Sequence, residues 1–163
     1  MLSAKMKKAL NKQINFEFYS SYLYLAMSAD FASKNLDGFA AWMQHQAQEE
    51  WGHGMKIYKY INDRGEKVKL DGIDTPPAEW ASVLEAFEAS YKHEQEVTKR
   101  IGDLMKLAQD ESDFASAAFL QWFITEQVEE EDNVSSIVEK LKMVGESPQG
   151  LFMLDRTVAQ RAS

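Results

Sequence analysis

Four long segments of the sequence carry apolar residues at spacings of three, four and seven, and each has an acidic residue near its middle. Such spacing places side chains on one face of an α-helix, so the sequence predicts four long helices. The segments run from Ser3 to about Phe31, from Asp37 to Arg64, from Ser82 to Gln109, and from Ser112 or Asp113 to Gly145. The residues near their middles are Glu17, Glu50 with His53, Glu94, and the cluster from Glu126 to Glu130.

The ends of these segments have residue types that are typical of helix boundaries. Ser3 and Asp37 are good N-terminal caps, and Gly65 is suited to stop the second helix. After the fourth segment, Ser147 as cap and Pro148 as first residue predict a short fifth helix.

The connection between the second and third helices is unusually long. Gly65 to Ala81 includes Pro76 and Pro77 and breaks every helical pattern. About 28 helical residues span about 42 Å, whereas about 17 extended residues reach about 55 Å. The connection can therefore run the full length of a bundle, which lets the third helix lie parallel to the second. The predicted fold is all-α: one domain over residues 1–163, a four-helix bundle with one long crossover connection and a short fifth C-terminal helix.

Composition limits the classes of function. The net charge of −8 argues against binding to nucleic acid driven by electrostatic attraction. The absence of cysteine excludes disulfides, iron–sulfur clusters and thiolate metal sites. The sequence has neither an apolar signal core near Met1 nor an apolar run long enough to span a membrane, so we expect a cytoplasmic protein that does not act on membranes.

The mid-helix acids are predicted to meet in the core. The midpoints of antiparallel helices share one level, and carboxylates belong in a core only if positive charge lies between them. Glu50 and His53, three residues apart, can bind the same ion from one helical face. Glu17 and Glu94 each interrupt an otherwise apolar or aromatic face. For one acid alone, a solvated side chain would be the better interpretation; the recurrence in four helices favours a metal site.

The acidic run of the fourth helix is harder to assign. Glu126 and Glu130 are four residues apart, so both can point inward beside Gln127. One or two acids of the run are expected to be ligands, and the run alone does not say which. Of the other acids in the run, Glu131 and Asp132 are expected to face water, and Glu129 is expected to be intermediate between inward and water-facing.

The ligand types narrow the choice of metal. Carboxylates with one imidazole suit iron, manganese or zinc, and the lack of sulfur argues against structural zinc. Five or six ligands exceed the need of one ion, so we expect a pair of ions about 3.5–4 Å apart, bridged by a carboxylate such as Glu50. Tyr24 and Trp122 are candidate redox or hydrogen-bonding groups, with plain core packing as the alternative. His45 and His93 lack a glutamate three residues before them and are expected not to be ligands.

Several motifs together resemble the non-haem ferritins of bacteria and archaea, over essentially the whole chain. The resemblance implies a ferritin-like fold, oxidation of Fe2+ in pairs by dioxygen, and storage of the ferric mineral in a homo-oligomeric shell of 24 subunits. The motifs are Asn15-x-Glu17, Tyr19-Ser-Ser-Tyr-Leu-Tyr24, Gln48-Glu-Glu-x-x-His53, His93-Glu94, Phe119-Leu-Gln-Trp-Phe123 and Glu126-Gln-Val-Glu-Glu-Glu131.

The resemblance also bears on haem binding and on alternative functions. Haem is not expected, because Trp51 stands where bacterioferritins place a haem-binding methionine, and Gln127-x-x-Glu130 replaces their second Glu-x-x-His. The alternatives are a di-iron oxygenase or peroxidase acting on an organic substrate, and a bundle with solvated acids.

The resemblance also implies roles for individual residues. The implied sites are a first iron site of Glu17, Glu50 and His53; a second of Glu50, Glu94 and Glu130 with Gln127 close by; and a third of Glu49, Glu126, Glu129 and Glu130.

Overall fold

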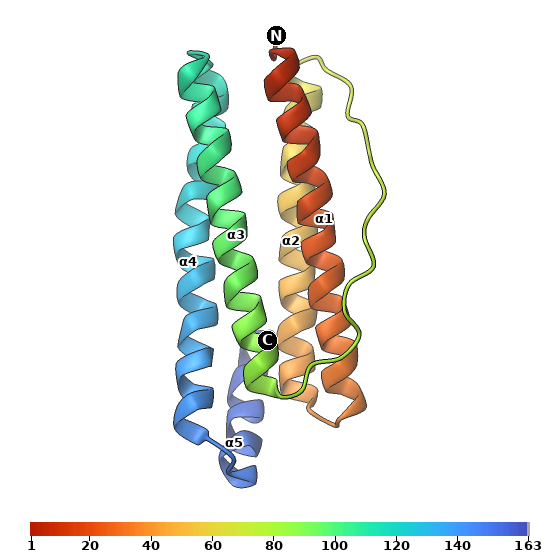
Figure 1. Cartoon of the computed structure of the whole chain (residues 1–163), viewed down its shortest axis with the longest axis vertical. Helices are drawn as coiled ribbons and strands as arrows, with labels where there is room; N and C mark the ends of the chain where they lie inside the picture. The colour runs from red at the N-terminus through yellow and green to blue at the C-terminus, as the bar shows by residue number, and fades with distance from the viewer. Residues whose placement is uncertain (163) are drawn as a thin grey trace.

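The structure, a computed structural model, describes residues 1–162, which form five α-helices and one short 3-10 helix. The first four helices lie side by side as a bundle, and α5 lies at one end of it (Figure 1). The predicted all-α fold is confirmed, with ends within a few residues of the expected ones. The elements are α1 (Ala4–Ser33), α2 (Asp37–Asp63), α3 (Val83–Asp110), α4 (Phe114–Val144), α5 (Pro148–Val158) and η1 (Ala159–Ala162).

The bundle consists of two helical hairpins. α1 packs mainly on α2, and α3 on α4. The connection from residue 64 to residue 82 leaves the far end of α2 and runs along the bundle to the start of α3 (Figure 1). α3 is therefore parallel to α2, as the length of the connection predicts.

Most helix starts are capped by a nearby side chain. Ser3, Ser82, Asp113 and Ser147 each accept a hydrogen bond from a backbone N–H three residues ahead, at 2.9–3.1 Å. These bonds satisfy N–H groups that a helix leaves unpaired in its first turn. Gly65, at φ +77°, takes the left-handed conformation that ends α2.

The predicted cap of α2 is wrong, because Asp37 is its first helical residue and the capping position belongs to Leu36, which supplies no side-chain hydrogen bond. Asp155 of α5 supplies it instead: its Oδ1 accepts from the backbone N–H of Phe39 at 2.9 Å. α5 approaches so closely that a Cβ on Gly38 would lie 1.7 Å from the carbonyl oxygen of Asp155. Only glycine fits at position 38 in this arrangement.

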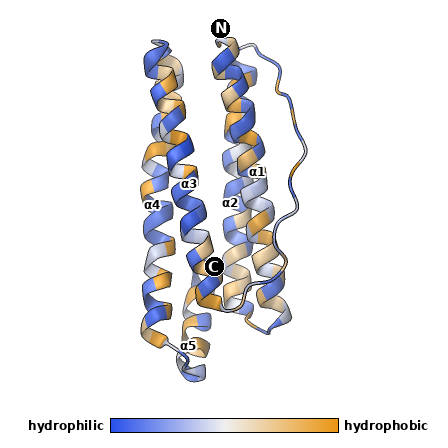
Figure 2. Ribbon diagram, in the orientation of Figure 1, coloured by the Kyte–Doolittle hydropathy of each residue, from blue (hydrophilic) through white to orange (hydrophobic). Residues whose placement is uncertain are grey.

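The core consists of two hydrophobic clusters, and polar and apolar residues alternate along every helix of the bundle (Figure 2). No helix within the described range has the length and apolar character needed to cross a bilayer. The cluster near α5 includes Tyr24, Met27, Phe31, Phe39, Trp42 and Phe87. The cluster at the opposite end includes Met6, Leu10, Ile14, Ile57, Ile101 and Phe123.

Candidate metal centre

Buried acids from all four long helices meet between the two hydrophobic clusters. α1 contributes Glu17, α2 contributes Glu50 and His53, α3 contributes Glu94, and α4 contributes Glu130. These five residues are only 0–5% exposed. The prediction that the mid-helix acids converge in the core is therefore confirmed, whereas their role as metal ligands stays a prediction.

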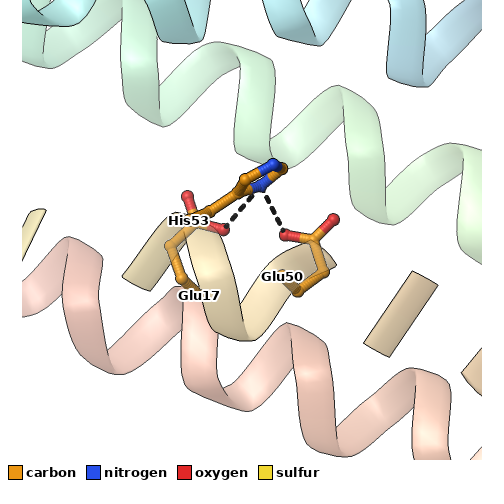
Figure 3. Close-up of side chains that lie close together, drawn as sticks. All are labelled: Glu17, Glu50 and His53. Atoms are coloured by element: carbon orange, nitrogen blue, oxygen red, sulfur yellow. Dashed lines mark hydrogen bonds and ion pairs between the residues drawn. The ribbon is translucent and has the colours of Figure 1, made fainter. Parts of the chain in front are cut away.

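His53 links the acids of α1 and α2. Its Nδ1 lies 3.2 Å from Oε2 of Glu50 and 4.0 Å from Oε2 of Glu17 (Figure 3). Its Nε2 lies 3.8 Å from Oε1 of Glu126. The imidazole thus stands between two sets of carboxylates, with one ring nitrogen directed to each.

Three groups of potential ligand atoms can be distinguished in the described chain, with all atoms of a group within 4.8 Å of one another. The groups share Glu50, His53 and Glu130, so they form a continuous series and are not three separate sites. They are Glu17, Glu50 and His53; Glu50, Glu94 and Glu130; and His53, Glu126 and Glu130.

The protein supplies little positive charge to these buried acids. Within residues 1–162, no lysine or arginine forms an ion pair with Glu17, Glu50, Glu94 or Glu130. Burial raises the pKa of Glu50 well above its ordinary value, and the charges of Glu94 and Glu17 raise it further. Burial likewise raises the pKa of Glu94 to about 7 and that of Glu130 to about 8. In the absence of a cation, these acids are therefore costly to ionise together.

The polar atoms of the site also fit a cation. Oε2 of Glu17 and Oε1 of Gln46 are buried without a hydrogen-bond partner. Buried polar atoms without partners cost free energy, and carboxylate oxygens and imidazole are ligands that iron accepts. A cation would give the unpaired oxygen of Glu17 a partner and would neutralise the neighbouring acids.

Two glutamine side chains, Gln13 and Gln46, hold acids of the centre in place. Gln13 donates to Oε1 of Glu17 at 2.9 Å. Gln46 donates to Oε1 of Glu50 at 3.1 Å and to Oε2 of Glu130 at 2.7 Å, so it ties α2 to α4. The sequence analysis assigned no role to Gln13 or Gln46. Their position, four residues before a mid-helix glutamate, was the available signal.

Gln127 and Tyr24 both contact Glu94. Nε2 of Gln127 donates to Oε2 of Glu94 at 3.2 Å, and the hydroxyl of Tyr24 donates to Oε1 of the same carboxylate. Burial, and next the charge of Glu94, raises the pKa of Tyr24 well above its ordinary value. Tyr24 is therefore a neutral hydrogen-bond donor at the edge of the site.

A second acidic cluster lies nearer the surface, between α2 and α4. Glu49 pairs with Nε2 of His45 at 3.2 Å and with Nη2 of Arg161 at 2.9 Å. Glu126 is partly buried and approaches His53, whereas Glu129 is exposed. Of the predicted third site, the ligand-atom groups include Glu126 and Glu130 but not Glu49 or Glu129.

Other polar and aromatic residues lie around the centre. His93 lies outside the ligand-atom groups. Its Nε2 lies 2.6 Å from Oγ of Ser20, and burial lowers its pKa to about 4. Trp122 meets the ring of His53 edge-on at 5.4 Å. Trp51, beside Glu50, is 52% exposed and stacks on Phe18.

The expectation that Glu131 faces water is wrong. Glu131 is only partly exposed, and its Oε2 accepts a hydrogen bond from Oγ1 of Thr98 at 2.7 Å. Asp132 is exposed, as expected. The face of α4 that carries Glu131 is therefore partly covered by α3.

The fold and the convergent acids define a four-helix bundle with one long crossover and a buried group of residues that could hold metal ions. Residues 7–144 match the family model of the ferritin-like domain. The chain belongs to the ferritin family.

Relatives and solved structures support this assignment over nearly the whole chain. A bacterial non-heme ferritin of Bacteroides fragilis is 43% identical over 161 residues, covering 99% of this chain and 100% of the relative. One from Staphylococcus epidermidis is 41% identical over 162 residues, covering 99% and 98%. The open pore ferritin of the archaeon Archaeoglobus fulgidus superposes with a TM-score of 0.97 at 50% identity, covering 98% of each chain.

Proposed function

We propose that this protein stores and detoxifies iron: it oxidises Fe2+ with dioxygen at the centre inside the bundle and keeps the product as ferric mineral in an oligomeric shell. The main support is the buried, uncompensated set of carboxylates with an orphaned Glu17 oxygen, in a chain of the ferritin family. Membership of the ferritin family argues against the alternative function, that of a di-iron oxygenase acting on an organic substrate.

The ligand-atom groups suggest how the substrate ions are held. One Fe2+ would bind to Glu17, Glu50 and His53, and the other to Glu50, Glu94 and Glu130. Glu50, common to both groups, would be the bridge. Bound as a pair, the Fe2+ ions supply electrons to dioxygen, one from each ion.

The residues of the chain control protons and water around this chemistry. Glu94 and Glu130, with pKa values raised to about 7 and 8, are partly protonated near neutral pH and release those protons when Fe2+ binds. Tyr24 and Gln127 hold the carboxylate of Glu94 through one oxygen each. The hydrophobic clusters on either side exclude bulk water from the site.

Four further points stay predictions. A third iron ion is proposed at Glu49, Glu126, Glu129 and Glu130, where it would take part in electron supply or in passing iron inward. The shell is proposed to contain 24 subunits. The protein is proposed to be cytoplasmic and free of haem.

The proposal is tested by adding Fe2+ in air to the purified iron-free protein and measuring particle size and iron retained per subunit. We expect a large shell that retains much more iron than its ligand groups can hold. Uptake that stops once the pair of sites is full would contradict storage.

A matched pair of histidine variants on α2 tests the centre itself. His53→Ala should slow the rapid phase of oxidation, because it removes a ligand of the pair. His45→Ala, which changes a histidine at the surface pair with Glu49, should leave that phase intact. Equal rates for the two variants would refute the assignment of His53.

A further inference from the structure

A pocket of about 460 Å³ between α2, α4 and the C-terminal segment joins the candidate centre to the surface. Its connection to the centre is Glu130, which is 2% exposed and also belongs to two of the ligand-atom groups. Lys140 and Arg161 are the cationic residues of its lining. The acidic residues of the lining are Glu49, Glu126, Glu129, Glu130 and Asp132.

Arg161 occupies this pocket as a positive charge that belongs to the protein. Its Nη2 donates to Oε2 of Glu49 at 2.9 Å, and its guanidinium carbon lies 4.3 Å from the centroid of the Trp42 ring. The side chain is 20% exposed. Its Nη1 is buried without a hydrogen-bond partner, so the guanidinium is incompletely satisfied where it lies.

The fold determines the position of this arginine. α5 is fixed to the bundle by the buried side chains of Leu154 and Val158 and by the cap that Asp155 provides to α2. η1 then packs against α2 and brings Arg161 over Trp42. The fold therefore holds the guanidinium in the lining of the pocket.

A metal cation at the proposed third site would need an acid that this guanidinium already holds. Glu49, proposed as a ligand of the third iron, is already paired with Arg161. Two cations a few ångströms apart repel each other, more strongly where water is scarce.

We propose that Arg161 sets how many cations the centre takes, because its guanidinium competes with a metal ion for Glu49. While Arg161 is paired with Glu49, the third position binds weakly, and a third cation enters only as the guanidinium turns away. The inference rests on the proposed function, since it assumes that the pair of sites at Glu17, Glu50, His53, Glu94 and Glu130 is filled first.

The test compares Arg161→Gln with Arg156→Gln in the intact oligomer. Arg156 is exposed on α5, so the control makes the same change in charge away from the pocket. The binding of Zn2+, which does not react with dioxygen, is followed by calorimetric titration. We expect Arg161→Gln to tighten the third equivalent by about tenfold, as loss of one ion pair with its ring contact implies, and to leave the first two equivalents unchanged. Arg161→Lys, which keeps the charge, should stay close to the parent protein.

The outcomes separate the inference from the proposed function. A third equivalent that is equally tight in Arg161→Gln and in the parent, or that tightens as much in Arg156→Gln, would overturn the role of Arg161. Loss of the third equivalent in Arg161→Gln would also overturn it, because the arginine would then support binding. Absence of the first two equivalents from the parent protein would instead overturn the proposed function.

Discussion

Glu49 and Glu50 are neighbours on α2, yet they lie in opposite environments. Glu50 is fully buried among other acids and has no lysine or arginine partner in the described chain. Glu49 is partly exposed and is paired with both His45 and Arg161. These adjacent residues point to different faces of α2. One face therefore carries an acid without a cationic partner, and the other carries an acid that the protein has already paired. Burial and pairing, and not residue type, distinguish the candidate centre from the pocket beside it.

The largest expected effect comes from removing the charge at Glu50. Glu50→Gln should slow the rapid oxidation of Fe2+ roughly hundredfold, since even partners of metal ligands cost up to about that much. The same variant should stabilise the metal-free protein by about 1–2 kcal/mol, because burial and neighbouring carboxylates oppose the charge of Glu50. Oxidation is followed by absorbance, and stability by urea unfolding at one protein concentration.

Glu88→Gln is the matched control, since Glu88 is exposed on α3. It should change neither oxidation nor unfolding measurably. If Glu50→Gln slowed oxidation but destabilised the metal-free protein, the inference that a charge on Glu50 destabilises the metal-free fold would be wrong.

The next effect concerns Gln46, whose amide joins Glu50 to Glu130. Gln46→Leu removes both hydrogen bonds and should weaken binding of the first two Zn2+ ions by between roughly tenfold and a hundredfold. Calorimetric titration measures the change. Gln44→Leu, at an exposed position of the same helix, is the control and should bind as the parent does. Unchanged affinity in Gln46→Leu would show that the acids keep their positions without the amide.

A smaller effect is expected when pH varies. Burial, and next the charge of Glu94, raises the pKa of Glu130 to about 8 from an ordinary value of 4.5. Between about pH 6.5 and 8 the folded state keeps a proton that the unfolded chain has lost. The free energy of unfolding of the metal-free protein should therefore fall by about 1.4 kcal/mol per pH unit for each such proton.

Urea unfolding at several pH values in this window checks the slope. His93, whose pKa burial lowers to about 4, contributes less as the pH rises through this window, because the unfolded histidine is about half protonated at its ordinary pKa of 6.5 and loses the rest of its proton above it. Glu130→Gln should flatten the dependence. A stability that rose with pH in the metal-free protein would contradict the raised pKa.

The smallest effect is expected at Glu49, the acid that is already paired with Arg161. Glu49→Gln removes a partly exposed ion pair and should cost about 1 kcal/mol or less in unfolding free energy. The rapid phase of Fe2+ oxidation should stay close to that of the parent, because Glu49 belongs to none of the three ligand-atom groups. Stopped-flow oxidation and urea unfolding measure the two quantities. Loss of the rapid phase would place Glu49 inside the centre and remove the contrast with Glu50.

Local and periodic signals predicted most of the fold. Ser3, Ser82 and Ser147 cap helices through neighbours three residues ahead, so the sequence near each start contains the whole interaction. The level of the mid-helix acids followed from helix length, and the direction of α3 followed from the length of the crossover. Each of these features depends on one segment or on simple geometry.

Contacts between distant segments could not be predicted in the same way. The cap of α2 comes from Asp155, 116 positions beyond Phe39, and no pattern near Asp37 reveals it. Glu131 was assigned to water from the stripe of α4 alone, whereas Thr98 of α3 reaches it. The place of Arg161 depends likewise on how the C-terminal segment folds back over α2.

The division of the bundle into two hairpins has a mechanical consequence. The α1–α2 hairpin carries Glu17, Glu50 and His53, and the α3–α4 hairpin carries Glu94, Gln127 and Glu130. Metal ions bound among them would link the two hairpins, since the hairpins could not then move apart without breaking metal–ligand bonds. Only the crossover joins the hairpins covalently, and most of its residues are exposed. If a protease cut the crossover, such metal–ligand bonds would still connect the two hairpins.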